Sequence, residues 1–221
     1  MIKIENVEVL GWEHAIRGMR NPLNSWDKSD SGYENNDWMH CPLDCTHFYD
    51  VGDNDLDLMK RLANAGTDHS KYRRMIVVYA DITSSLYFFK EFDTYKVGTV
   101  ANSCSTMHKI HAKEFTLDDF SHEHCGMLTT DVFLQHIIPI LNINRELFLE
   151  TKDKNYWWQM IQLLPSSYNQ KRTVMLNYEV LANMYKSRKS HKLDEWIEFC
   201  KWIETLPYSE LITGKEVEEH E

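Results

Sequence analysis

The sequence predicts a helix-rich α+β fold with a small antiparallel or mixed sheet. Two segments, 2–9 (IKIENVEV) and 75–82 (MIVVYADI), have the alternating or β-branched composition of strands. Much of the remaining chain, above all beyond residue 131, has the apolar spacing of helices that bury one face. Because 221 residues suit one hydrophobic core, we expect a single domain over residues 1–221.

The N-terminal elements are predicted from glycine, proline and polar residues that interrupt the apolar pattern. A short helix is expected over 13–20, where Pro22 ends it. Residues 21–54 are polar and predict a long loop or insertion. A helix is then expected over 55–65, with Gly66 in the C′ position that favours glycine.

The middle of the chain is expected to pass from strand 75–82 into a helix. Either Ser84 or Ser85 can cap this helix, which runs to about Tyr95. Residues 97–107 are small and polar without a clean period, so we expect a loop whose accessible backbone packs against another element. Further helices are expected to begin at Thr116 and to cover 131–149, 154–163, 171–189 and 192–203, before a frayed charged tail at 215–221.

Composition and charge exclude several classes of function. Hydrophobic residues make up 43% and charged residues 26%, as in ordinary globular proteins. A net charge of −10 argues against direct binding to a nucleic-acid backbone, although it leaves room for a small pocket that binds one phosphate. No apolar run approaches the ~18 residues of a membrane span, and residues 1–10 lack a signal-peptide pattern. We therefore expect a cytoplasmic protein without a membrane partner.

Two short segments contain residues of the types that bind zinc. His40–His47 (HCPLDCTH) places four such residues within eight positions, and His122–Cys125 (HEHC) is a weaker case. Structural zinc sites usually combine two ligand pairs across a longer loop, so incidental residues in a loop are the favoured explanation. We expect free thiols at the five scattered cysteines, Cys41, Cys45, Cys104, Cys125 and Cys200.

The common glycine-rich nucleotide and hydrolase motifs are absent from the sequence. It contains no G-x-G-x-x-G, no G-x-x-x-x-G-K-[ST] and no G-x-S-x-G. Nucleotide chemistry would therefore need another scaffold.

The expected helix 171–189 carries three polar residues at regular spacing. At about 100° per residue, Arg188 lies about 20° from Asn177 around the helix, and Leu181 and Met184 fall between them. Asn183 points about 120° away from that line. Solvated polar residues beside a core stripe are the ordinary explanation of such a pattern. The alternative is that this helix, with polar groups on two faces, touches more than one neighbour or a ligand.

This pattern resembles the C-terminal signature of the flavin-dependent thymidylate synthases. In that family a Leu-Pro pair precedes an Asn by the interval that separates Leu164-Pro165 from Asn177. The family's helix then continues Asn, Leu, Asn, Arg in the register of Asn177, Leu181, Asn183 and Arg188.

The resemblance extends upstream over residues 66–107. There the family has a Gly-His turn, a strand, a helix ending Arg-Gln-x-x-Arg-His-Arg, and a loop with Ser, Asn-Glu, Ser and Arg-Tyr. This chain has His69 at the turn, Lys90-Glu91 for Arg-Gln and Thr94-Tyr95-Lys96 for Arg-His-Arg. In the loop it has Thr99, Asn102-Ser103, Ser105 and Met107-His108 at the corresponding positions.

The resemblance implies a fold, ligands and site residues. Members of the family are homotetramers that bind FAD, reduce it with NADPH and methylate dUMP with methylenetetrahydrofolate. The implied cofactor contacts are His69, Lys96, Asn102, Asn177 and Asn183, and the implied substrate contacts are Ser103, Ser105 and Arg188. No catalytic side chain is implied, because flavin hydride chemistry needs no protein nucleophile. His69, Ser103 and Ser105 can also be explained as local hydrogen-bond partners of the loops.

The departures from the family pattern remove positive charge. Lysine cannot make the bidentate fork that arginine offers a phosphate, and each lost charge-assisted hydrogen bond is worth about 1.5–3 kcal/mol. Cations that could compensate are Arg73, Arg74, His108, Lys109, Lys113, Lys171 and Arg172.

Two functions therefore stay open. One is a divergent flavin-dependent thymidylate synthase acting on dUMP or a similar pyrimidine nucleotide, and the other is a non-catalytic nucleotide-binding, sequestering or protein-interaction protein of the same fold.

Overall fold

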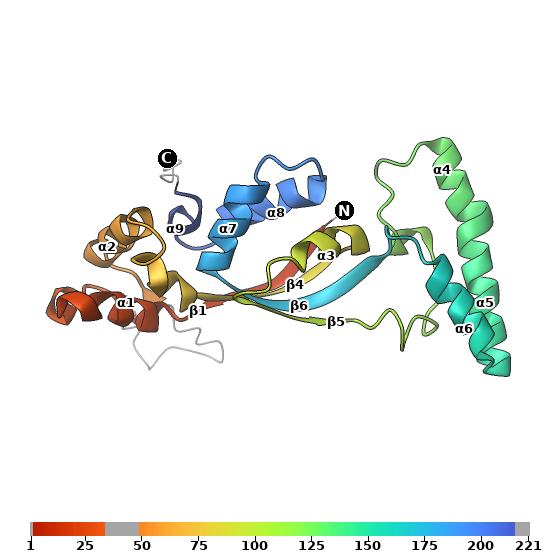
Figure 1. Ribbon diagram of the computed structural model, residues 1–221, viewed down its shortest axis with the longest axis horizontal. Coiled ribbons are helices and arrows are strands. Elements are labelled where there is room, and N and C mark those ends of the chain that lie inside the picture. Colours follow the sequence, from red (N-terminus) through yellow and green to blue (C-terminus); the bar gives the residue numbers. More distant parts are fainter. Residues whose placement is uncertain (1, 34–48, 215–221) are drawn as a thin grey trace, which may run out of the picture.

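The computed structural model describes residues 2–33 and 49–214 (Figure 1). Its centre is an antiparallel sheet with the strand order β1-β4-β6-β5. These strands are β1 (Lys3–Leu10), β4 (Val77–Ser85), β5 (Thr99–Ser103) and β6 (Asn169–Asn177). A separate ribbon pairs β2 (Gly32–Tyr33) with β3 (Tyr49–Asp50). The predicted helix-rich α+β class with a small sheet is confirmed.

The α-helices of the described ranges lie before, between and after these strands. They are α1 (Trp12–Arg20), α2 (Asp53–Asn64), α3 (Leu86–Phe92), α4 (Met127–Val132), α5 (Ile138–Thr151), α6 (Lys154–Leu163), α7 (Tyr178–Arg188), α8 (Asp194–Glu204) and α9 (Glu210–Thr213). Short 3₁₀ helices occupy Asn21–Leu23, Trp26–Lys28, Ser70–Arg74 and Leu117–Asp119, and a π-helical turn, Phe133–Ile137, joins α4 to α5.

Local signals placed several of these elements correctly. Gly66 follows α2 at φ +107°, the left-handed conformation expected of a C′ glycine. Ser85 caps α3, where its hydroxyl oxygen accepts a hydrogen bond from the backbone N–H of Phe88 at 3.3 Å.

The predicted helix 171–189 is wrong over its first part. Residues 169–177 form β6, which pairs with β4 on one side and with β5 on the other. The predicted loop 97–107 correspondingly contains β5. The run Thr173–Leu176 fits both a helical and an extended period, and only its two neighbouring strands decide for the sheet.

One face of the sheet forms the main core. Helices α3, α7 and α8 cover this face (Figure 1). The buried side chains beneath them include Val78, Ile82, Leu176, Leu181 and Met184. The last two are the apolar residues predicted between Asn177 and Arg188. On the opposite face Tyr79 and Val100 are exposed.

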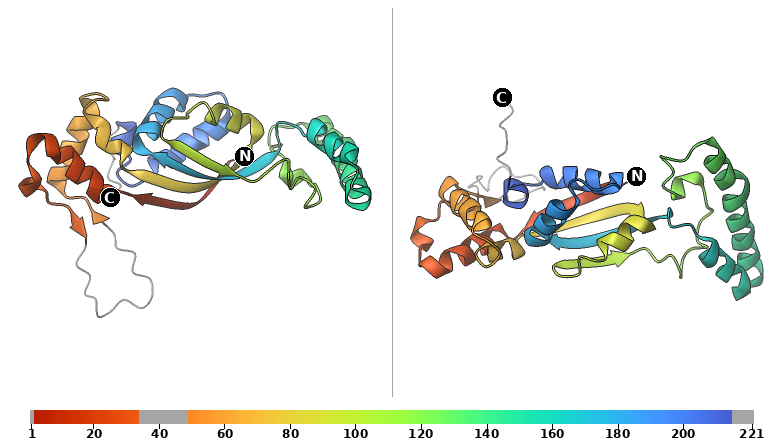
Figure 2. Two further views of the ribbon diagram at one scale, coloured as in Figure 1. Left: turned by 60° about the horizontal axis from the view of Figure 1, so that its bottom comes forward. Right: turned by 45° about the horizontal axis from the view of Figure 1, so that its top comes forward.

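Residues between β5 and β6 leave the sheet and form a helical lobe at one end of the molecule (Figure 2). This lobe has its own buried cluster, which contains Phe115, Phe120, Phe133, Leu141 and Met160. The part of the chain that the structure describes therefore has two hydrophobic clusters, with the sheet and its helices around the larger one.

Candidate functional site

Asn177 ends β6 and begins α7. Its Oδ1 accepts a hydrogen bond from the backbone N–H of Val180 at 2.9 Å, so the side chain caps the helix. Gly98 lies directly against it: a Cβ on that glycine would stand 2.6 Å from Asn177 Nδ2. The neighbouring Thr99 hydroxyl is buried and has no hydrogen-bond partner within the described ranges. With one lone pair of Oδ1 used by the cap, Asn177 still offers a ligand its Nδ2 donor and one further acceptor site on Oδ1.

Asn183 lies on another side of α7 and lines a cavity of about 470 Å³. The cavity is bounded by α2, α7, α9 and the turn at Gly66 and Thr67. The exposed His69 follows in the same turn. The structure thus brings Asn183 and the predicted Gly-His turn to one region of the surface.

The Asn183 cavity has a positive balance of charge. Among the described residues, four basic side chains, Lys60, Arg73, Lys186 and Lys189, and two acidic ones, Glu179 and Glu210, line it. Arg73 pairs with Glu179 at 2.9 Å, and Lys60 pairs with Glu210 at 3.4 Å.

Both carboxylates are therefore neutralised, whereas Lys186 and Lys189 make no ion pair with any described residue. A local excess of positive charge in a protein of net charge −10 favours an anionic ligand. Neither lysine was among the predicted contacts, although Lys186 follows Asn183 by three residues and Lys189, directly after α7, by six.

Arg188 is engaged inside the chain. Its Nη1 lies 2.6 Å from a Glu91 carboxylate oxygen, and its Nε donates to the Tyr95 hydroxyl at 3.0 Å. The guanidinium also stacks 4.9 Å from the Trp196 ring centroid. Glu91 in turn accepts a hydrogen bond from the Trp196 indole N–H at 3.1 Å. Asn177, Asn183 and Arg188 therefore make their contacts in three different places.

The remaining predicted contacts lie on loops and on β5. Lys96 and Asn102 are exposed, and Ser103 ends β5 opposite Arg172. Ser105 accepts hydrogen bonds from the backbone N–H groups of Met107 and His108 at 3.2 and 2.9 Å, as expected of a local turn partner. The ligand roles of these residues stay predictions.

Most of the cations expected to compensate for lost arginines are already paired. Lys171 lies 3.0 Å from Asp81, Arg172 lies 2.6 Å from Asp93, and Lys113 pairs with Asp119. The Lys171 pair contributes to lowering the pKa of Asp81 to about 2, after the hydrogen bonds from Thr173 and Asn6. These cations could reach a phosphate only by giving up a carboxylate.

The described residues of the predicted zinc segments make ordinary contacts. His124 Nε2 lies 2.9 Å from Asp194, and His122 Nδ1 lies 2.8 Å from the Phe120 carbonyl oxygen. No group of three potential metal ligands occurs within 2–33 and 49–214. The segment His40–His47 lies outside these residues. In the same ranges, no helix has the length and apolar composition needed to cross a membrane.

Comparison with known proteins identifies the fold. No protein-family model matches the chain, and no curated protein matches its sequence. Two crystal structures of thymidylate synthase X from Helicobacter pylori, each with FAD and dUMP, do match. One has a TM-score of 0.67 and 16% identity, covering 97% of this chain and 98% of the other. The second has a TM-score of 0.64 and 17% identity, covering 95% and 99%. The chain therefore has the fold of the flavin-dependent thymidylate synthases.

Proposed function

We propose that the chain is a divergent flavin-dependent thymidylate synthase that binds FAD and acts on dUMP or a similar pyrimidine nucleotide. The observation that carries this proposal is the positively charged Asn183 cavity in an otherwise acidic protein of this fold. The Helicobacter pylori proteins of the same fold were crystallised with FAD and dUMP. NADPH and methylenetetrahydrofolate would be the co-substrates.

The donors around the cavity fit an anionic dinucleotide. Lys186 and Lys189 offer ammonium groups to phosphate oxygens, and Thr67 and Asn183 offer a hydroxyl and an amide that can donate or accept. The bound flavin would supply the electron transfer of the reaction. The side chains of this chain would hold and orient the cofactor and exclude water, and Asn177 and Lys96 stay candidate contacts beside β5.

Cofactor binding can be tested without turnover. We expect FAD to raise the melting temperature of the purified protein and the bound flavin to colour it yellow. Ligand at 100 times its Kd should add about 2.7 kcal/mol to the free energy of unfolding. The double variant Lys186→Ala/Lys189→Ala should lose most of this shift, whereas Lys28→Ala, an exposed lysine on the 3₁₀ helix 26–28, should keep it. Colourless protein that FAD does not stabilise would remove the proposal.

The second candidate is a nucleotide-binding protein without flavin turnover. The loss of the family's Arg-His, replaced here by Thr94-Tyr95, supports it, because these positions no longer supply the positive charge of the family pattern. NADPH oxidation that depends on both dUMP and methylenetetrahydrofolate would support catalysis. Nucleotide binding without any such oxidation would support the second candidate.

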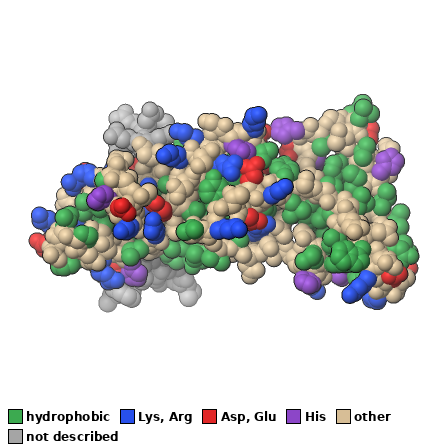
Figure 3. All heavy atoms as spheres, viewed as in Figure 1, with side chains coloured by type: hydrophobic (Ala, Val, Ile, Leu, Met, Phe, Trp, Pro, Cys, Tyr) green, Lys and Arg blue, Asp and Glu red, His purple; other side chains and the backbone are tan. Residues whose placement is uncertain are grey.

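We also propose a homotetramer, as the resemblance implies. Hydrophobic side chains gather on the helical lobe (Figure 3), where Leu128, Ile143 and Trp158 are exposed. Burial of these side chains between subunits would remove apolar surface from water. Sedimentation should give a tetramer for the parent chain and smaller species for Leu128→Glu/Ile143→Glu. A monomeric parent would contradict this proposal while leaving cofactor binding to its own test.

A further inference from the structure

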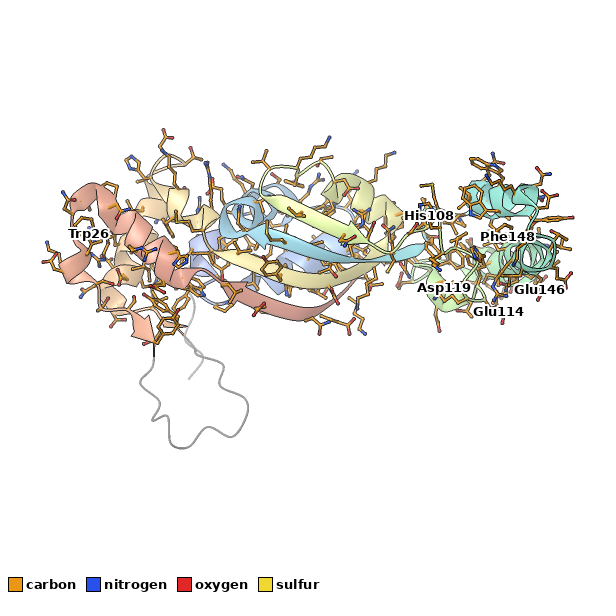
Figure 4. All side chains as sticks on the ribbon, turned by 90° about the horizontal axis from the view of Figure 1, so that it is seen from below. Trp26, His108, Glu114, Asp119, Glu146 and Phe148 are labelled. Atoms are coloured by element: carbon orange, nitrogen blue, oxygen red, sulfur yellow. The ribbon has the colours of Figure 1, made fainter. Side chains whose placement is uncertain are left out.

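The outer edge of β1 is open. β1 pairs with β4, and no other strand of the described ranges pairs with it. Figure 4 shows β1 as the outermost strand on its side of the sheet, leading directly into α1. Unpaired backbone N–H and C=O groups along such an edge can accept a further strand.

The open edge borders a cavity of about 950 Å³. The second half of β1, Val7–Leu10, lines it on one side, and the ribbon residues Tyr33 and Tyr49 and the loop residue Tyr208 line it as well. Four extended residues cover about 13 Å, so the exposed edge and the cavity together offer room for a short extended peptide.

The lining of this cavity selects a positively charged occupant. Its carboxylates are Glu8, Glu13 and Asp50, of which Glu13 also lies 4.0 Å from the exposed Arg17, and no described lining residue is lysine or arginine. Tyr33 and Tyr49 pack edge to face, with their ring centroids 5.1 Å apart. Aromatic rings beside carboxylates attract guanidinium and ammonium groups through both ring faces and charge.

Two residues with positive φ border the edge segment. Asn6, at φ +53°, lies in a register shift of β1 between Glu5 and Glu8, and Tyr208 has φ +50°. Non-glycine residues rarely adopt this conformation, and strain of this kind is concentrated at functional positions. The shift leaves Asn6 and Val7 without register partners and separates the paired segment Lys3–Glu5 from the paired segment Glu8–Leu10, which borders the cavity.

We propose that Val7–Leu10 and the adjoining cavity bind an extended segment of a partner protein that carries arginine or lysine side chains. The segment would add to the sheet beside β1, with its backbone paired to the open edge and its cations among Glu8, Glu13 and Asp50. A second copy of this chain fits less well, because it would bring its own Glu5 and Glu8 toward the same carboxylates.

Fluorescence anisotropy with short labelled peptides tests this proposal on the full chain. A peptide that alternates arginine and valine should bind at least tenfold more tightly than the matching glutamate-valine peptide. N-methylation of alternate backbone amides on one edge of the basic peptide should weaken binding at least tenfold, and methylation of the other edge should leave it unchanged. This asymmetry distinguishes strand addition from general attraction to an acidic surface.

Charge variants complete the test. Glu13→Gln/Asp50→Asn should weaken binding of the basic peptide about three- to tenfold. Glu146→Gln, at the opposite end of the molecule (Figure 4), should bind the peptide as tightly as the parent does. Melting temperatures show whether each variant is folded. Equal binding of the acidic and basic peptides, equal effects of methylation on both edges, or a β1-dependent dimer that excludes the peptide would each overturn the proposal.

Discussion

The guanidinium of Arg188 lies 2.6 Å from the carboxylate of Glu91 and joins α7 to α3. Since Arg188 also stacks on Trp196, the same side chain reaches α8. His191 Nε2 lies 3.3 Å from the Glu91 carboxylate, so the carboxylate faces three nitrogen groups. The last residue of the family-like signature therefore holds three helices together in this chain.

Replacement of Arg188 by alanine should destabilise the fold. The change removes an ion pair, a hydrogen bond to Tyr95 and a stacked guanidinium, so we expect a loss of about 1–3 kcal/mol in the free energy of unfolding measured with urea. Arg188→Lys should recover only part of this free energy, because lysine has no planar guanidinium to stack on Trp196 or to bond to two groups at once. Arg61→Ala, which removes an exposed pair with Asp57, is the control and should cost less than about 0.5 kcal/mol. Equal costs at both positions would show that Arg188 is an ordinary surface residue.

The variant Glu91→Gln separates the structural role of Arg188 from a nucleotide role. Glutamine keeps the shape and can still accept a hydrogen bond, but it no longer neutralises the guanidinium. If Arg188 contacts the nucleotide, dUMP should bind about three- to tenfold more tightly, as calorimetry would measure. Unchanged dUMP affinity in both Glu91→Gln and Arg188→Ala would discard the predicted substrate contact.

Asp55 forms a buried anchor between α2 and the N-terminal segment. It is fully buried, its Oδ1 lies 2.6 Å from Arg20 Nε, and its Oδ2 accepts hydrogen bonds from the Ser29 and Ser31 hydroxyls. Burial raises the pKa of Asp55, but the hydrogen bonds from Ser29, Ser31 and Arg20 outweigh it, and the pKa falls below its ordinary value of 3.8.

Asp55→Asn should therefore show a pH-dependent cost. At neutral pH it leaves Arg20 buried without its charge partner, and we expect a loss of about 3 kcal/mol. Because the folded chain holds the Asp55 proton less tightly than the unfolded chain, the parent loses this stabilisation as the pH falls below about 4. Urea unfolding should thus give parent and variant curves that converge in acid. Asp57→Asn, on the exposed face of the same helix, should stay close to the parent throughout.

The residues that begin and end helices were predictable from the sequence, whereas the choice between strand and helix at 171–176 was not. Ser85 and Gly66 act within a few residues of their own positions, so propensity alone identified Gly66 and left only Ser84 or Ser85 as the cap. The strand β6 depends on partners far away in the chain: Ser85, which pairs with Asn169, lies 84 residues earlier. Its sequence has no signal strong enough to indicate those partners.

Prediction of the candidate site from the sequence also failed where contacts join distant parts of the chain. The signature named Asn183 and His69 as separate candidate contacts, and only the fold shows that Asn183 and the turn at Gly66 and Thr67 line one cavity. The engagement of Arg188 was not visible, since Glu91 lies 97 residues earlier in the chain and its carboxylate meets the guanidinium only through helix packing. Long-range ion pairs of this kind require a structure.

Gly98 and Gly66 provide a matched pair that isolates the contact at Asn177. Both have positive φ, +80° and +107°, so alanine at either position carries a backbone cost of roughly 1 kcal/mol. Only at Gly98 does a Cβ meet another group, Asn177 Nδ2 at 2.6 Å, while the space around Gly66 is open.

Gly98→Ala must therefore also displace the side chain that caps α7, which should lower the free energy of unfolding by about 1 kcal/mol more. Urea unfolding of both variants measures the difference. If FAD binds through Asn177, Gly98→Ala should also weaken the binding of FAD. Gly66→Ala borders the Asn183 cavity without a steric contact and should change the FAD affinity less. Identical stabilities would show that the close approach of Gly98 to Asn177 contributes nothing to the fold.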